Sequence, residues 1–277
     1  MTKKNQEKIS KENSRFWDEL CGSQLARHLG IQDSSLQSLK KYDDWYFDYY
    51  PYLENHINFK ELEGKKVLEI GLGYGTVSQK IAESGARYQG LDIAPGPVAM
   101  VNQRLAQKGL KGEALHGNIL NPPFGKGDFD VIVAIGCLHH TGDLRKAVQN
   151  CFTLLQAGGR LIFMVYYAYS LRRWTQAPRV TFSYLFSEFK GFRGVVEDSD
   201  PRQRAAYDKN SAGDGAPHTD WISKQSLAEM CKEFKNLKMR TENMDSFPMF
   251  PKIDRHQILK TKIPFYLGLD LYVTATK

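Results

Sequence analysis

The sequence has few cysteines and no long apolar run. Its four cysteines, Cys21, Cys137, Cys151 and Cys231, lie far apart and form no C-x-x-C pair. That spacing favours neither a disulfide framework nor a zinc site, so we expect no metal and a reducing compartment, the cytoplasm. No apolar stretch is long enough to cross a bilayer, and the charged N-terminus lacks the apolar core of a signal peptide. We therefore expect no membrane partner.

Charge of one sign is not concentrated in any segment. The 277 residues include 38 Lys and Arg against 31 Asp and Glu, a formal net charge of +7. The basic residues are spread along the chain, and acids interleave with them in the dense N-terminal stretch. A scattered surplus is more typical of a soluble surface than of a nucleic-acid footprint. We therefore do not expect a nucleic-acid partner.

From Lys65 onward, short apolar strands alternate with amphipathic helices. The pattern predicts strands over 65–71, 87–93, 112–119, 129–136 and 160–167, with helices over 76–85, 96–109 and 143–159. A helix over 223–234 and strands over 236–244 and 267–277 close the chain. Such alternation indicates βαβ units, a parallel sheet and right-handed crossovers. Before Lys65, residues 1 to about 14 are polar and expected to fray, and helical spacing starts at Phe16.

No internal repeat and no low-complexity linker divides the chain. The regular rhythm stops after Tyr167 and returns near Ser223, so the intervening segment is predicted to be an insertion rather than part of a minimal doubly wound fold. Aromatic residues are dense in it. The predicted units are an N-terminal helical cap over 1–59, a cofactor-binding core over 60–165, a lid insertion over 166–221 and the C-terminal part of the core sheet over 222–277.

The ends of the first three strands carry residues suited to an adenosine-containing ligand. Open α/β sheets bind ligands beyond the carboxyl ends of their strands. The first strand ends in "LEIGLGYGT", whose alternating glycines allow a ligand to approach the backbone, although Thr76 stands where the nicotinamide fingerprint needs glycine. Asp92 can accept both hydroxyls of a ribose, and Ile93 can cover an adenine. Asn118 offers a carbonyl oxygen to an adenine amino group.

Together these segments resemble the class I S-adenosylmethionine-dependent methyltransferases, and most nearly the ubiquinone/menaquinone-biosynthesis type. The likeness covers Val67 to Tyr166, and weakly the last fifty residues. "VLEIGLGYG" resembles the first motif of the family, "FDVIVAIGCLHH" its fourth strand and "LLQAGGRLIF" the following turn and strand. Two residues depart from the family pattern: Asn118 replaces the usual aspartate and Ala157 the usual proline.

The resemblance implies a fold, a cofactor and a set of cofactor-binding residues. The fold would be α/β and doubly wound (Rossmann-like), with a seven-stranded mostly parallel sheet, an antiparallel last strand and a helical aromatic-rich lid. The cofactor would be S-adenosyl-L-methionine, leaving as S-adenosyl-L-homocysteine. Two alternatives stay open, a helix cap for Asp92 and an internal hydrogen bond for Glu69. The expected cofactor-binding residues are Glu69, Gly71, Leu72, Gly73, Gly75, Asp92, Ile93, Asn118, Ile119, Ile135 and Gly136.

Two short motifs compete for the role of catalytic segment. "NPPF", from Asn121 to Phe124, spells the tetrapeptide with which amino-methylating enzymes clamp a planar amine at the end of strand four. Here it precedes the fourth strand, where its prolines favour a turn. "LHH" follows that strand directly, at the opening toward which the methyl group would point. His140 is therefore the preferred general base and His139 the second candidate, with packing against the sheet as the alternative for each.

The predicted function is transfer of a methyl group to an oxygen or nitrogen atom of a small-molecule acceptor, with specialised metabolism as a candidate setting. Aromatic residues of the cap and lid would wall the acceptor pocket, and the expected acceptor-binding residues are Tyr46, Tyr166, Tyr207 and His218. The alternatives are an RNA (tRNA) methyltransferase and a protein that binds the cofactor without methylating. The sequence names neither the acceptor nor the oligomeric state.

Overall fold

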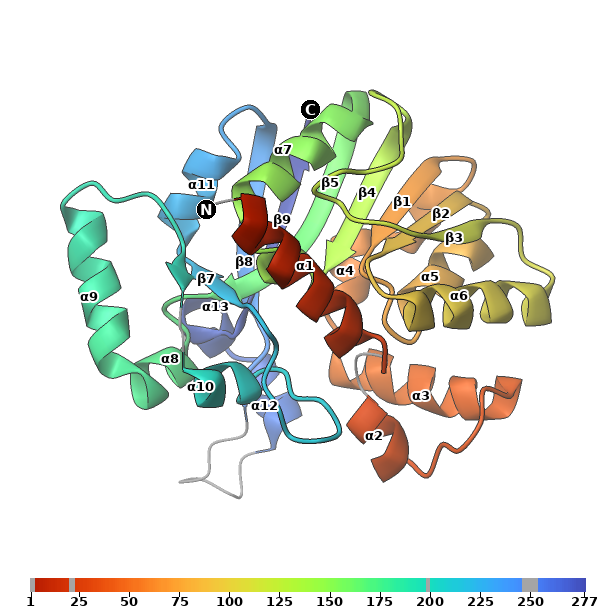
Figure 1. Cartoon of the computed structure of the whole chain (residues 1–277), viewed down its shortest axis with the longest axis horizontal. Helices are drawn as coiled ribbons and strands as arrows, with labels where there is room; N and C mark the ends of the chain where they lie inside the picture. The colour runs from red at the N-terminus through yellow and green to blue at the C-terminus, as the bar shows by residue number, and fades with distance from the viewer. Residues whose placement is uncertain (1–2, 20–22, 198–199, 246–253) are drawn as a thin grey trace.

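A single mixed β-sheet organises the chain. The computed structural model describes residues 3–19, 23–197, 200–245 and 254–277. Within them the sheet has nine strands (Figure 1): β1 (Lys66–Ile70), β2 (Arg87–Asp92), β3 (Glu113–His116), β4 (Phe129–Ile135), β5 (Leu155–Tyr167), β6 (Val196–Glu197), β7 (Asp220–Ile222), β8 (Lys235–Glu242) and β9 (Asp270–Thr276).

Seven of these strands form the predicted core in the order β3-β2-β1-β4-β5-β9-β8. The pairs from β3 to β5 are parallel, whereas β9 runs antiparallel to both β5 and β8. The predicted seven-stranded sheet with an antiparallel last strand is therefore confirmed. The insertion adds two short strands that the sequence did not predict, because β7 extends the end of β5 through the pair Tyr166 and Trp221, and β6 pairs with β7.

Helices cover both faces of the sheet. Alternate residues of β4 and β5 point to opposite faces: Ile132 and Phe163 belong to one buried cluster, Val133 and Ile162 to the other. The helices are α1 (Lys3–Trp17), α2 (Ser23–His28), α3 (Leu36–Tyr49), α4 (Leu53–Ile57), η1 (Phe59–Leu62), α5 (Thr76–Glu83), α6 (Pro95–Lys108), η2 (Leu138–His140), α7 (Leu144–Leu154), α8 (Leu171–Gln176), α9 (Pro178–Phe189), α10 (Pro201–Ala205), α11 (Lys224–Met230), α12 (Arg255–Leu259) and α13 (Ile263–Leu267).

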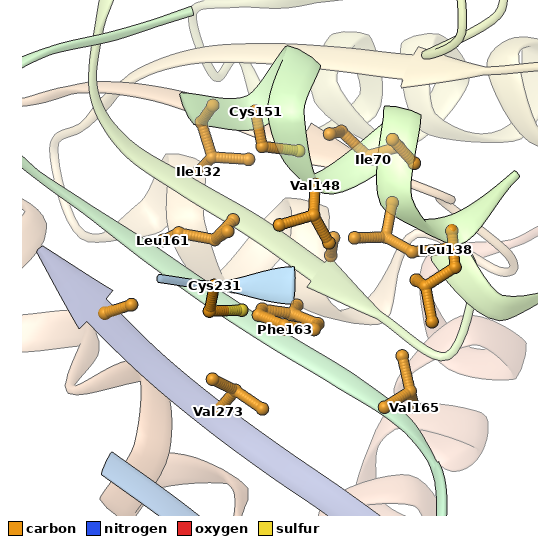
Figure 2. Packing of buried hydrophobic residues seen from close by; sticks show 14 of the residues in the cluster. Ile70, Ile132, Leu138, Val148, Cys151, Leu161, Phe163, Val165, Cys231 and Val273 are labelled. Carbon is orange, nitrogen blue, oxygen red and sulfur yellow. The ribbon is translucent and has the colours of Figure 1, made fainter. Parts of the chain in front are cut away.

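The first of the two clusters lies between the sheet and the pair α7 and α11. Figure 2 shows its side chains gathered between α7 and the strands, among them Val148 and Cys151 of α7 and Phe163 of β5. The second cluster packs α4, α5 and α6 against the other face. The helix predicted over 143–159 ends at Leu154, because the chain from Leu155 already pairs with β4 as part of β5.

The N-terminal segment differs from its prediction. Residues expected to fray form most of α1, which Figure 1 shows lying across the front of the sheet. The expectation failed because α1 is polar on average and is held by contacts that sequence periodicity does not reveal, such as the hydrogen bond from Gln6 Nε2 to the Thr141 carbonyl. The helical pattern predicted from Phe16 to Leu29 is interrupted, since α1 ends at Trp17 and α2 begins at Ser23.

The insertion extends from one side of the molecule to the end of α1, because the Ser211 amide, in the loop after α10, donates to Glu19 Oε1 at 2.6 Å. Figure 1 shows α8, α9 and α10 together on that side, beside β7. β5 ends at Tyr167, two residues beyond the predicted end of the cofactor-binding core at 165. The division of the chain into four units stays a prediction. No helix in the described ranges is both long and apolar enough to cross a membrane.

Candidate active site

A deep cavity lies at the carboxyl ends of β1, β2 and β4. It encloses about 1130 Å³ of space, including its open mouth. Its lining combines strand-end residues of the sheet with side chains from α1, α3 and η2. Ten of the eleven predicted cofactor residues line it: Glu69, Gly71, Leu72, Gly73, Asp92, Ile93, Asn118, Ile119, Ile135 and Gly136.

Two positions of the glycine turn after β1, Gly71 and Gly75, have no room for a side chain. Gly71 has a φ of +78°, and a Cβ at this position would overlap Cys137. Gly75 does not line the cavity; with a φ of +76° it caps α5, and a Cβ there would meet Arg104. Only glycine combines that backbone conformation with such close neighbours. The turn therefore brings backbone to the cavity wall.

Asp92 ends β2 with its carboxylate at the cavity. Oδ2 accepts a hydrogen bond from the Leu72 amide at 2.7 Å, and Oδ1 accepts one from the Ala94 amide at 2.9 Å. Burial raises the pKa of Asp92, and these amides oppose the rise. Asp92 is not the cap of α6, which follows Ala94. Each oxygen keeps a lone pair for a further donor, such as a ribose hydroxyl.

Glu69 is buried at the floor of the cavity. Its Oε2 accepts a hydrogen bond from the Tyr88 hydroxyl at 2.7 Å, so the internal bond left open by the sequence is present, while the residue also lines the cavity. Burial raises the pKa of Glu69 to about 7. The carboxyl group therefore holds its proton to higher pH than an exposed glutamate does.

The third strand leads into a turn that reaches the cavity. Asn118 lines it, with Oδ1 accepting from the Leu120 amide at 2.9 Å and Nδ2 donating to Ser10 Oγ of α1 at 3.1 Å. The "NPPF" segment lies outside the cavity lining. Its Phe124 packs edge-on against Phe129 at the start of β4, with ring centroids 5.2 Å apart. NPPF is thus a turn before the strand, as predicted, and not a clamp at the strand's end.

The residues after β4 form a single 3-10 turn, η2, that is buried. His140 lines the cavity, and His139 does not. Neither ring nitrogen of His139 has a hydrogen-bond partner in the described residues, and burial lowers its pKa well below the usual range. Its ring lies 4.1 Å from those of both His140 and Tyr166. Of the two predicted bases, only His140 lines the cavity.

Both nitrogens of His140 face the insertion. Nδ1 is 2.7 Å from the His218 carbonyl oxygen, which can only accept, so Nδ1 carries a proton. Nε2 lies 3.4 Å from Asp208 Oδ2, which also accepts from the Tyr166 hydroxyl at 2.8 Å. Burial lowers the pKa of His140 while Asp208 raises it, and burial raises the pKa of Asp208. The sequence did not indicate Asp208, because only the folding of the insertion brings this residue next to η2.

Only one of the four predicted acceptor-binding residues lines the cavity. Tyr46 of α3 lines the cavity. Tyr166 and Tyr207 stand behind it, with rings 4.6 Å apart, and His218 reaches His140 through its backbone carbonyl while its ring bonds Asp220. The sequence did not single out the wall residues of α1 and α3 other than Tyr46, namely Ser10, Asn13, Trp17 and Tyr42.

The residues present fit the predicted cofactor. An acid with free lone pairs at the end of β2, a glycine turn whose backbone lines the cavity and a cavity larger than a nucleoside supply the sites for ribose, amino acid and adenine. The apolar side chain of Ile93 lies beside Asp92 on the same wall. Strand-end geometry thus places the expected binding groups around one space.

Comparison with known proteins supports the same assignment. Residues 68–163 match the family model described as a methyltransferase domain. A ubiquinone biosynthesis O-methyltransferase of Stutzerimonas stutzeri is 29% identical over 119 residues, which are 40% of this chain and 47% of that protein. The chain thus matches less than half the length of this curated relative. The predicted resemblance and the predicted cofactor are confirmed at the level of this domain.

Solved structures support the fold. The YcgJ protein of Bacillus subtilis superposes with a TM-score of 0.55 at 17% identity, covering 82% of this chain and 98% of that one. The [4+2]-cyclase SpnF gives a TM-score of 0.52 at 13% identity, covering 81% and 80%. The second protein is named for a different reaction, so the fold alone does not decide the activity.

Proposed function

We propose that the protein transfers a methyl group from S-adenosylmethionine to an oxygen or nitrogen atom of a small-molecule acceptor. The observation that carries the proposal is one cavity whose lining combines two kinds of residue. The glycine turn and Asp92 suit the cofactor, and aromatic side chains and His140 suit an acceptor. The space is enclosed on one side by α1 and α3, which favours a small acceptor over a polymer.

The residues of this chain would mainly bind and orient. The cofactor supplies an electrophilic methyl group when bound. Asp92 would hold the ribose, the Gly71–Gly75 turn would contact the amino-acid part, and Ile93 would cover the adenine. Tyr46 and Trp17 would hold the acceptor in line with the methyl group. Such alignment can contribute about 7–11 kcal/mol to lowering the barrier.

An acceptor hydroxyl must also lose its proton, and the His140–Asp208 pair is the group placed to take it. With Nδ1–H held by the His218 carbonyl, only Nε2 can gain a proton. A hydroxyl of the acceptor bound beside His140 would release its proton to Nε2, and Asp208 Oδ2, 3.4 Å from Nε2, would stabilise the protonated ring. General base catalysis of this kind contributes roughly 10²–10⁴-fold.

Two features favour particular details of the proposal. The relative's name, an O-methyltransferase, adds weight to oxygen as the methylated atom. The three described cysteines, Cys137, Cys151 and Cys231, are unpaired, while Cys21 lies outside the described residues. Unpaired buried thiols suit a reducing compartment, so we keep the cytoplasm as the proposed location.

A non-methylating ligand binder is the second candidate, since the fold also occurs in a protein named a cyclase. RNA methylation has only the scattered net charge of +7 in its favour.

The deciding experiment incubates the protein with methyl-labelled S-adenosylmethionine and a cell extract separated into metabolites, RNA and protein. We expect label in the metabolite fraction, and mass spectrometry of that fraction would identify the acceptor. Label in RNA would overturn the small-molecule proposal, and label in no fraction would favour the non-methylating binder. His140→Asn should reduce incorporation, whereas His28→Asn, at an exposed position of α2, should not.

A further inference from the structure

Helix α1 turns one face toward the cavity and the segment after β4. Gln6, Ser10, Asn13 and Trp17 recur at intervals of three and four residues, so they share a face. Gln6 Nε2 donates to the Thr141 carbonyl and Asn13 Nδ2 to the His140 carbonyl, both at 2.6 Å. Trp17 stands with its ring centroid 5.0 Å from that of His140. The helix therefore roofs the segment after β4.

Asn13 leaves a buried acceptor without a partner. Its side chain is 3% exposed and lines the cavity. The His140 carbonyl can only accept, so the amide nitrogen must face it and the orientation of the group is fixed. Oδ1 is then the free end, buried and without a hydrogen-bond partner in the described residues. A buried unpaired acceptor is unfavourable by about 1–3 kcal/mol, and a ligand N–H or O–H would remove that cost.

The position of Asn13 associates this acceptor with the methyl-accepting molecule rather than with the cofactor. The predicted cofactor contacts along β4 end at Gly136, and Asn13 is anchored four residues further, at His140. Trp17, one turn further along α1, adds an aromatic surface there. The adenine end is served instead by Asn118, which Ser10 contacts.

The charges around the cavity restrict the acceptor further. Two acids, Glu69 and Asp92, line it, and its described lining includes neither Lys nor Arg. A carboxylate or phosphate on the acceptor would add a second anionic group to the carboxylate that the cofactor itself brings, with no Lys or Arg in the described lining to pair with it. A neutral or cationic acceptor avoids that cost.

We propose that Asn13 is an acceptor-binding residue, whose Oδ1 receives a hydrogen bond from an O–H or N–H of a planar acceptor that carries no negative charge. The inference rests on the proposed function and adds the class of acceptor to it. It assigns to α1 a binding role in addition to its covering role.

The test measures binding without turnover. Protein saturated with S-adenosylhomocysteine is titrated by ligand-observed NMR with three phenols of similar size: 4-hydroxybenzyl alcohol, which is neutral, tyramine, which is cationic, and 4-hydroxybenzoate, which is anionic. We expect the neutral and cationic phenols to bind and the anion to bind at least tenfold more weakly. Asn13→Leu should weaken the neutral phenol about tenfold, as expected for one buried hydrogen bond.

Gln6→Leu is the matched control, because it removes an equal anchoring bond from α1 but lies outside the cavity lining. An equal loss in both variants would reduce Asn13 to a structural anchor and overturn the proposal. So would preferential binding of the anion, or a loss of S-adenosylhomocysteine affinity in Asn13→Leu as large as the loss for the phenol. Thermal unfolding of each variant verifies that it is folded. Absence of methyl transfer alongside phenol binding would contradict the proposed function and leave Asn13 in place.

Discussion

Asp92 is the single residue on which cofactor affinity should depend most. Its two oxygens already accept amide hydrogen bonds and retain lone pairs toward the cavity. Asp92→Asn removes the charge and one acceptor, so we expect the dissociation constant for S-adenosylhomocysteine to rise roughly ten- to hundredfold, as for loss of a charged hydrogen bond. Isothermal titration calorimetry measures this. Asp130→Asn is the control, because Asp130 also accepts a backbone amide but at the amino end of the sheet; equal weakening in both would refute a specific role for Asp92.

The His140–Asp208 pair should be detectable by its titration. Asp208 faces Nε2, Tyr166 bonds Asp208, and His139, His218 and Asp220 surround the ring, with Arg172 acting on Asp208. Because Asp208 raises the pKa of His140, Asp208→Asn should lower it, and the acid limb of the pH–rate profile should move to lower pH. An NMR titration of the His140 ring proton measures the shift without an acceptor.

Asp214→Asn provides the control for that titration, since Asp214 is an exposed carboxylate of the same insertion. If the titration of His140 is unchanged in Asp208→Asn, Asp208 does not influence the His140 ring and the predicted pairing is refuted.

Sequence reasoning at the residue scale succeeded where a residue's role follows from its position in a strand. Ten of the eleven predicted cofactor residues line one cavity, because strand ends of a parallel sheet converge. Asp208 and Asn13 were missed for a physical reason. Each acts through a contact with His140, which is 68 positions from Asp208 and 127 from Asn13. No local sequence pattern marks such distant contacts.

At the scale of elements, α3 should depend on one buried ion pair. Asp43 accepts hydrogen bonds from both terminal nitrogens of Arg104 of α6, at 2.9 and 3.0 Å, and from the Thr76 hydroxyl at 2.6 Å. The Arg104 side chain is 1% exposed. Asp43→Asn leaves that cation without its partner, so we expect unfolding to become easier by roughly 2–4 kcal/mol and hydrogen exchange in α3 to accelerate. Denaturant titration and exchange mass spectrometry measure the two effects.

The same helix supplies a control in Asp44, which forms an exposed pair with Lys40. Asp44→Asn should cost less than about 1 kcal/mol. Comparable losses from both variants would show that the Arg104 pair has no special part in holding α3, and with it Tyr42 and Tyr46, at the cavity.

The sequence predicted those elements in which the spacing of apolar residues reflects which faces are buried. Strand β4 and the second half of β5 are nearly all apolar because both their faces are covered, and α5, α6 and α7 bury one stripe each. Helix α1 escaped prediction because polar hydrogen bonds rather than an apolar stripe hold it in place. The strands β6 and β7 escaped because segments of two and three residues carry no measurable period.

For the molecule as a whole, buried carboxyl groups should make stability fall as pH rises. Burial raises the pKa of both Glu69, in β1, and Asp270, in β9, to about 7. Between their ordinary values and pH 7 the folded protein retains protons that the unfolded chain releases, so stability decreases through this window and reaches its lower level above it. The two residues lie on different strands, so their contributions should nearly add.

Glu69→Gln tests this directly, because glutamine can still accept the Tyr88 hydroxyl bond but has no proton to lose. At pH 8 the variant should be more stable than the parent protein by up to about 3 kcal/mol, the energy that corresponds to the shift from 4.5 to about 7, whereas at pH 5 the gain should be small. Urea denaturation at the two pH values measures it, with Glu113→Gln at an exposed strand end as the control. A gain that is the same at both pH values would mean that packing, and not ionisation of Glu69, produces the effect. Because Glu69 lines the cofactor cavity, a pH-dependent gain would also show that the site is assembled at a cost in stability.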